Sequence, residues 1–162
     1  MITYRLTTLD DGKYLKEWLL QEGVQEGFPM STPSEVDDAV SRWISFAPYK
    51  ASVTALDDEK PVGLATLYLN PYKKLVHQCE CGILVATDFQ SRGIGKGLMK
   101  ELFSLAKTFH IELLSLQVQT HNQRAIKLYG QFGFKTFAEQ THWLKNEEGS
   151  YGGRLLMECP VE

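Results

Sequence analysis

Three glycines and two cations stand together in the stretch 92–97, which reads Arg-Gly-Ile-Gly-Lys-Gly and could bind an anion. The apolar run Gly82–Val85 before it predicts a buried strand, and from Ile94 onwards apolar residues recur at helical spacing. The glycines therefore lie where a strand turns into a helix. Glycine lets a ligand approach the backbone, and the first N–H groups of a helix have no partner within it. Together with the helix dipole, this arrangement predicts a pyrophosphate site.

The spacing of these glycines differs from the patterns of two familiar phosphate-binding loops. The dinucleotide pattern Gly-x-Gly-x-x-Gly and the Walker pattern Gly-x-x-x-x-Gly-Lys-Ser/Thr are both absent. The pattern that is present is Gln90-x-x-Gly93-x-Gly95. It resembles the acyl-CoA loop of the GNAT superfamily of N-acetyltransferases.

A second pattern follows one predicted helix and one predicted strand later. It reads Asn122-x-x-Ala125-x-x-Leu128-Tyr129-x-x-x-Gly133-Phe134. This stretch resembles the second GNAT signature, and the two patterns stand in the order that the family has. The resemblance runs from about Val76 to Phe134, whereas the N-terminal third of the chain fits only through the order of its elements.

The resemblance implies a sheet that opens between the strand ending at Val85 and the strand containing Leu116. Acyl-CoA would enter this gap, with its pyrophosphate on the N–H groups of residues 92–97. Its pantetheine would run along Leu84 and Val85 like an added strand, and Asn122 would hold the cofactor arm. The implied cofactor-binding residues are Leu84, Val85, Gln90, Arg92, Gly93, Ile94, Gly95, Lys96, Gly97, Asn122, Arg124 and Tyr129. For Arg124 and Lys127, a phosphate contact and a purely solvent-facing role are both open.

Acetyl transfer to an amine needs a neutral amine, a polarised thioester and a stabilised thiolate. A lysine-type amine, with a pKa of ~10.4, must lose a proton before it attacks. The backbone N–H of Val85 is the candidate donor to the thioester oxygen, and Tyr129 is the candidate catalytic residue at the sulfur. A phenol, with a pKa of ~10, is less acidic than a thiol at ~8.5, so a hydrogen bond to the departing sulfur is expected rather than full proton donation.

The sequence leaves more than one candidate for the general base. Some family members that acetylate protein N-termini carry Leu-Glu-Val on the strand before the second pattern, but residues 116–118 read Leu-Gln-Val here, and glutamine is no base. Glu80 on the preceding strand and His121 beside Asn122 are the alternatives, directly or through water. A solvent-facing strand glutamate and a surface histidine are the competing interpretations.

No metal is expected. His77, Cys79 and Cys81 fall on one side of a predicted strand, but alternating ligands on a single strand cannot close a tetrahedron unaided. Packing is the favoured interpretation of these side chains.

Composition narrows the class of protein. The chain has 162 residues, which fits one domain over 1–162, and 43% of them are apolar. A net charge of −3 without a basic run argues against a nucleic-acid partner. No apolar stretch is long enough for a bilayer, the N-terminus lacks a signal-peptide profile, and three cysteines do not make a disulfide framework. We expect a cytoplasmic, reduced protein.

The apolar patterns predict an α/β or α+β layered domain with a mixed sheet and helices on both faces. The GNAT resemblance implies that the sheet is single and mostly antiparallel. Asp10 or Asp11 is expected to cap the first helix, and Thr32 and Glu35 to form a capping box on the second. The loop Gln25–Ser31 between them is expected to be irregular. The predicted strands are Ile2–Leu6, Ala51–Leu56, Val62–Leu69, Val76–Val85, Leu114–Gln119, Phe134–Leu144 and Tyr151–Cys159.

The resemblance implies an acetyl-CoA-dependent N-acetyltransferase that acts on a primary amine by direct attack in a ternary complex. The one-domain size and the missing glutamate favour a small molecule as the acceptor. The first alternative is a protein N-terminal or lysine acetyltransferase, and a homodimer is also open. A peptide substrate requires an open channel lined by Gln25–Ser31 and the last hairpin, whereas a small molecule requires a closed pocket there. The alternative from another class is a non-catalytic acyl-CoA-binding module, which needs no amine site.

Overall fold

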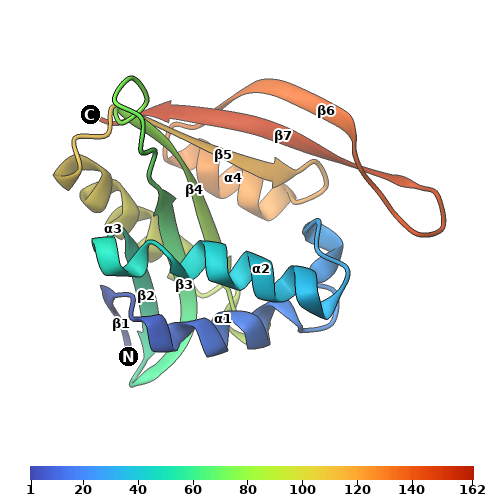
Figure 1. The fold of residues 1–162 in the computed structure, drawn as a ribbon, viewed down its shortest axis with the longest axis horizontal. Coiled ribbons are helices and arrows are strands. Elements are labelled where there is room, and N and C mark those ends of the chain that lie inside the picture. Colours follow the sequence, from blue (N-terminus) through green and yellow to red (C-terminus); the bar gives the residue numbers. More distant parts are fainter.

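The computed structural model describes residues 1–162 and contains seven strands and four α-helices (Figure 1). The strands are β1 (Ile2–Leu6), β2 (Ser52–Asp57), β3 (Lys60–Tyr68), β4 (Gln78–Val85), β5 (Leu113–Gln119), β6 (Lys135–Lys145) and β7 (Tyr151–Pro160). The helices are α1 (Gly12–Leu19), α2 (Pro33–Ile44), α3 (Ile94–Thr108) and α4 (Gln123–Gln131). The loop before α2 contains a short 3-10 turn, Gln25–Gly27, so it is less irregular than expected.

All seven strands belong to one sheet, in the order β1-β2-β3-β4-β5-β7-β6. Every neighbouring pair is antiparallel except β4 and β5, which are parallel and are connected through α3. A parallel pair needs such a crossover, because a short turn cannot return the chain to the same end of the sheet. The expected single, mixed and mostly antiparallel sheet is confirmed.

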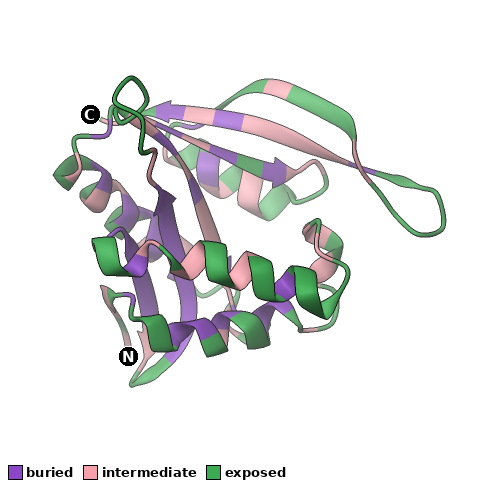
Figure 2. Cartoon of the chain, in the orientation of Figure 1, coloured by how far each residue is buried: buried purple, intermediate pink, exposed green.

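The helices cover both faces of the sheet, as expected. On one face α1 and α2 bury Leu15, Leu19 and Val36 against Leu64 and Leu84. On the other face α3 packs its apolar side chains into a larger cluster with β2, β3, β5 and β7. Figure 2 shows the result as nearly continuous burial along β2 and β3, which lie between the two helical layers. Beyond β4, the face that carries α1 and α2 has no further helix over β5, β7 and β6 (Figure 1).

The start of α2 follows the sequence signal with one difference. The Thr32 hydroxyl accepts a hydrogen bond from the Glu35 N–H at 3.2 Å, and Pro33 takes the first helical position. The Glu35 carboxylate does not return to the N–H of Thr32. It accepts instead from the N–H and the hydroxyl of Ser31, at 3.0 and 3.1 Å. The predicted capping box is therefore displaced by one residue.

The predicted cap on α1 is wrong, because the acid before this helix has other partners. Asp11 is only 2% exposed, and its carboxylate accepts from both terminal nitrogens of Arg5, from the Thr8 N–H and from the Thr54 hydroxyl. Burial by itself would raise the pKa of Asp11, but these hydrogen bonds outweigh it and hold the pKa below its ordinary value. The carboxylate thus joins β1, β2 and the start of α1, and it holds that helix against the sheet.

The sheet opens between its two parallel strands. Only Gln78, Cys79 and Glu80 of β4 are paired with β5, opposite Leu113–Ser115. Beyond Glu80 the two strands diverge (Figure 1), as the resemblance predicts. Beyond this point β5 stays paired with β7 as far as Gln119, and β4 stays paired with β3 as far as Val85.

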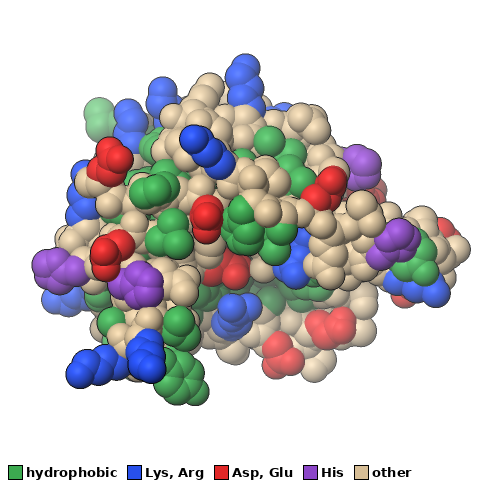
Figure 3. Space-filling model, turned by 90° about the horizontal axis from the view of Figure 1, so that it is seen from above, with side chains coloured by type: hydrophobic (Ala, Val, Ile, Leu, Met, Phe, Trp, Pro, Cys, Tyr) green, Lys and Arg blue, Asp and Glu red, His purple; other side chains and the backbone are tan.

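The outer surface carries both signs of charge. Figure 3 shows lysine, arginine and acidic side chains interspersed on one face, without a continuous basic area. No helix of the chain has the length and apolar character that a membrane crossing requires.

Candidate active site

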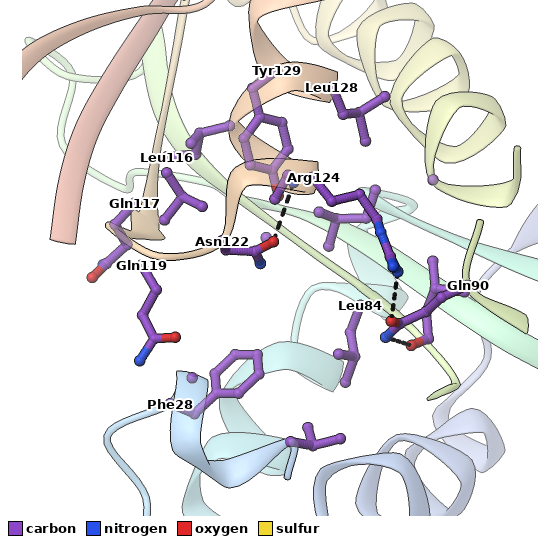
Figure 4. Close-up of a pocket in the computed structure, with 18 of the residues that line it drawn as sticks. Phe28, Leu84, Gln90, Leu116, Gln117, Gln119, Asn122, Arg124, Leu128 and Tyr129 are labelled. Atoms are coloured by element: carbon purple, nitrogen blue, oxygen red, sulfur yellow. Dashed lines mark hydrogen bonds between the residues drawn. The ribbon is translucent and has the colours of Figure 1, made fainter. Parts of the chain in front are cut away.

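A cavity of about 1130 Å³ lies where β4 and β5 diverge. It is bordered by the ends of these strands, by the glycine turn before α3, by the start of α4 and by the loop before α2 (Figure 4). The sequence-predicted site residues that line it are Glu80, Leu84, Val85, Gln90, Gly93, Gly95, Lys96, His121, Asn122, Arg124 and Tyr129. Arg92, Ile94 and Gly97 do not.

The edge of β4 presents unpaired main-chain groups to this cavity. Ala86 donates its N–H to Val62 at 2.8 Å, and Val85 lies opposite Gly63 in the same ladder. Hydrogen-bonded pairs alternate along antiparallel strands, so the N–H of Val85 points away from β3 and toward the missing part of β5. The same holds for Ile83, which also lines the cavity. A ligand in the gap therefore finds two main-chain donors two residues apart.

Ile83 is a site residue that the sequence analysis missed. Alternation along a strand predicts that every second amide faces the gap, but it does not tell which set does. Leu84, the residue expected instead, belongs to the other set, which is bonded to β3. It contributes its side chain, which lines the cavity (Figure 4).

The glycine turn leaves the start of α3 open to a ligand. Gly93 has a φ of +81°, in the left-handed region that favours glycine, and it provides no side chain to cap the helix. The N–H groups of Ile94, Gly95 and Lys96 have no main-chain partner. The positive end of the helix and the Lys96 side chain, which lines the cavity, add positive charge at the same place.

Gly97, the third glycine, contributes to helix packing. The Gly97 N–H donates to the Gly93 carbonyl at 3.1 Å, so it is already used within α3. A Cβ at this position would collide with the phenol of Tyr4 on β1. Gly97 thus permits β1 to pack on the helix, and its N–H is not available to a phosphate.

Arg92 and Ile94, two other predicted cofactor-binding residues, do not line the cavity with their side chains. The guanidinium of Arg92 rests over the ring of Phe89, at 4.9 Å from its centroid. The Ile94 side chain is buried in the core. Ile94 can therefore contact a ligand only through its main-chain N–H.

Gln90 joins the glycine turn to α4 across the mouth of the cavity. Its side-chain nitrogen donates to the Val85 carbonyl at 3.3 Å, and its oxygen accepts from Arg124 at 3.0 Å (Figure 4). Asn122 caps α4 by accepting from the Ala125 N–H at 3.2 Å. The two sequence patterns therefore meet in space, although a helix and a strand separate them in the chain.

Tyr129 projects from α4 into the cavity (Figure 4). Its side chain is 7% exposed and packs edge-on against Phe134, with 5.9 Å between the ring centroids. The hydroxyl has no partner within the protein. Burial raises the pKa of Tyr129, with a smaller contribution from Cys81. The phenol is therefore a protonated donor that faces the cavity.

A polar network crosses the gap on the opposite side of the sheet. The Gln117 amide donates to the Glu80 carboxylate at 2.9 Å, and its oxygen accepts from Arg154. Arg154 also donates to Gln140 at 2.9 Å and lies over the ring of Trp143. Gln117, which stands where some family members carry a glutamate, is a bridge here. The sequence analysis did not predict this network, because Gln140, Trp143 and Arg154 belong to the final hairpin, far along the chain from Glu80.

The cavity runs through the sheet from face to face. Along β4 the Glu80 and Leu84 side chains share one face, and Leu84 packs with α1 and α2. Cys81 points to the other face, into the same cluster as Tyr129. A ligand in the gap therefore has the phenol of Tyr129 on one side and the carboxylate of Glu80 on the other.

The predicted packing role of the β4 cysteines agrees with their burial. Cys79 and Cys81 are buried, and burial raises the pKa of Cys79 to about 12. His77 lies outside the strand and is exposed. No three His, Cys, Asp or Glu side chains are grouped so as to hold a metal ion.

The chain belongs to the acetyltransferase (GNAT) family, whose pattern its residues 13–134 match. It is 30% identical over 79 residues to a [ribosomal protein bS18]-alanine N-acetyltransferase of Salmonella typhimurium, across 49% of this chain and 53% of that one. It is 24% identical over 107 residues to the L-amino acid N-acetyltransferase AaaT of Escherichia coli, across 65% of this chain and 66% of that one. The match thus spans about half to two thirds of these curated relatives.

A solved structure extends the likeness to the whole fold. The yncA protein of Salmonella typhimurium, solved with its cofactor acetyl-CoA, superimposes with a TM-score of 0.84 at 14% identity. The superposition covers 100% of this chain and 95% of that one. At this identity the likeness establishes the fold, which is the GNAT fold expected from the two patterns.

The contact between α3 and α4 yields a prediction about stability. A Cβ at Gly95 would lie 3.3 Å from a methyl carbon of Leu128. Gly95→Val should therefore lower the free energy of unfolding by about 1–3 kcal/mol through overpacking. Urea denaturation measures the loss, and Leu128→Ala in the same chain should remove most of it. Gly130→Val is the matched control, because nothing lies within 4 Å of a Cβ there. Equal losses at both glycines would contradict the close approach.

Proposed function

We propose that residues 1–162 act as one GNAT-like domain that transfers an acetyl group from acetyl-CoA to a primary amine. The observation that carries this proposal is the pair of open donors in one cavity: the unpaired N–H groups of Ile83 and Val85, and the uncapped start of α3. A strand edge suits an extended amide-bearing chain, and an open helix start suits a pyrophosphate. Coenzyme A has both parts. The yncA protein, which shares the fold, was solved with acetyl-CoA.

The cofactor residues divide into main-chain and side-chain contributors. The N–H groups from Gly93 to Lys96 would hold the pyrophosphate, with Lys96 and Arg124 as flanking cations. The pantetheine would lie along β4, bonded to Ile83 and Val85. The Asn122 oxygen caps α4, so its amide nitrogen is the group left to bind the cofactor arm.

Each reacting group would have a separate role in this proposal. The Val85 N–H would donate to the thioester oxygen as it gains charge. An ammonium acceptor gives up two protons in total. The first passes through Glu80 to solvent, which leaves a neutral amine. As the C–N bond forms and the C–S bond breaks, the second leaves nitrogen and ends on the sulfur, beside the Tyr129 hydroxyl. Glu80 and Tyr129 lie on opposite sides of the gap, so the amine would enter on one side and the thiol leave on the other.

A contact across the cavity favours a small acceptor. The Gln119 side chain on β5 donates to the carbonyl of Glu26 at 2.6 Å. This hydrogen bond ties the 3-10 turn Gln25–Gly27 to β5 across the acceptor side, where a peptide would need an open channel. The Escherichia coli relative acts on L-amino acids, and the Salmonella relative acts on a ribosomal protein. A protein acceptor is therefore the second candidate. The cytoplasmic location and the homodimer stay predictions.

The role of Tyr129 can be tested without altering the cavity's shape. Tyr129→Phe should lower kcat by roughly 10²-fold, as loss of a donor to a charge-developing atom does. The dissociation constant for acetyl-CoA should stay unchanged, because the main-chain donors are intact. Thiol release with a panel of amines and calorimetry measure the two quantities. Unchanged turnover would remove Tyr129 from the mechanism. Tight binding without transfer to any amine, in the unaltered protein, would favour the non-catalytic module.

The choice of base can be tested through pH. Glu80→Gln keeps an oxygen for Gln117 but cannot accept a proton, so kcat/KM near neutral pH should fall by about 10²-fold. The deficit should shrink as pH approaches the pKa of the amine, because the acceptor is then already neutral. The His121→Gln variant removes the other candidate and should keep most of the activity. A loss in the histidine variant alone would transfer the role of base to His121.

A further inference from the structure

Arg154 presents a positive charge to the acceptor side of the cavity without a carboxylate partner. The side-chain ion pairs of the protein are Arg5 with Asp11 and Lys16 with Asp37, and Arg154 takes part in neither. Its Nε and Nη1 donate to the neutral amides of Gln140 and Gln117. Its other terminal nitrogen, Nη2, has no partner. The charge of this half-buried guanidinium is therefore oriented by neighbours that do not neutralise it.

The surroundings hold this guanidinium in place. Two side-chain amides fix its plane, and it lies 5.0 Å from the ring centroid of Trp143. A planar, immobilised guanidinium with a free NH₂ group is suited to donate a charge-assisted hydrogen bond to a carboxylate oxygen. Because the group is already ordered, an anion that binds to it loses little additional entropy.

Arg154 is separated from Glu80 by a single carboxamide. Gln117 donates to Glu80 with its nitrogen and accepts from Arg154 with its oxygen. All three side chains line the same cavity. A group that takes a proton from the amine and a group that binds a carboxylate thus face one space, only about one side-chain amide apart.

We propose that the acceptor is an amine with a carboxylate next to the reacting nitrogen, which is the α-amino acid class. Arg154 binds the carboxylate, and Glu80 receives the proton of the amine. This inference rests on the proposed acetyl transfer and adds to it the residue that selects the acceptor.

The wall beside Glu80 indicates the kind of side chain. Trp43 and Tyr68 reach β4 at Gly82, two residues from Glu80 on the same face, and atoms of both lie about 3 Å from where a Cβ would stand. Phe28 and Met30 also line the cavity, and like Trp43 they pack against the cluster that contains Leu84. This wall is apolar and aromatic, so an apolar or aromatic amino acid is the acceptor that it fits.

A second arginine provides the matched control. Arg42 on α2 also lines the cavity and has no carboxylate partner, but it is exposed and lies over the ring of Tyr68, at 4.5 Å from the centroid. No hydrogen bond fixes it. Arg42→Gln and Arg154→Gln thus make the same chemical change on two sides of the acceptor space.

The experiment compares phenylalanine with its primary amide and with its decarboxylated amine, 2-phenylethylamine. The amide has the more acidic ammonium and the decarboxylated amine the less acidic one, so a preference over both cannot come from amine protonation. We expect kcat/KM for the acid to exceed both by about 10- to 100-fold, the range for a charge-assisted hydrogen bond. Arg154→Gln should abolish the preference for the acid over the two other amines, whereas Arg42→Gln should retain that preference. Equal rates in the unaltered protein, or loss of the preference only in the Arg42 variant, would overturn the proposal.

Calorimetry separates this proposal from the proposed enzyme activity. With CoA present, phenylalanine should bind at least tenfold more tightly than its amide, and Arg154→Gln should remove that difference while acetyl-CoA binding stays intact. Intact acetyl-CoA binding also shows that the variant is folded. A binding preference without turnover would contradict the acetyl transfer alone. Turnover of amines without any preference for the acid would contradict the role of Arg154 alone.

Discussion

The candidate site depends on the stretch in which β4 and β5 are not hydrogen-bonded to each other. The parallel pairing of β4 and β5 ends at Glu80, and from there the main chain of β4 has a partner on one side only. Two unpaired N–H groups in a cavity are costly unless water or a ligand satisfies them. The neighbouring elements hold the gap open, because β5 remains paired with β7 while α1 and α2 cover one face of β4. The divergence is therefore a fixed property of the sheet.

The other features of the site are arranged around this gap. Gln90 and Arg124 join its two borders at the mouth, and Gln119 joins the loop before α2 to β5 at the acceptor end. Between these bridges, Tyr129 lies on the face of α3 and α4, and Glu80 lies on the face of α1 and α2. In the proposed reaction, the amine would enter on one face of the sheet and the thiol would leave on the other.

Short-range patterns predicted the parts of the site that are local in sequence. The turn with Gly93 and Gly95 lies where a strand meets a helix, and the pattern from Asn122 to Tyr129 lies along one helix and its N-terminus. Contacts between distant segments could not be predicted in this way. The role of Gly97 depends on Tyr4, which lies near the start of the chain, and the role of Gln117 depends on Arg154 in the last strand. The choice between Ile83 and Leu84 depends on which amides β3 already uses, and this is a property of the ladder.

Amide hydrogen exchange at β4, followed residue by residue with and without acetyl-CoA, tests the central claim most directly. Without the ligand, the N–H groups of Ile83 and Val85 should exchange rapidly and that of Leu84, bonded within the ladder, slowly. With saturating acetyl-CoA, Ile83 and Val85 should become protected together with Gly95 and Lys96. Slow exchange at Ile83 and Val85 in the free protein, or no change at these amides on saturation, would contradict a cofactor site built on the open edge of β4.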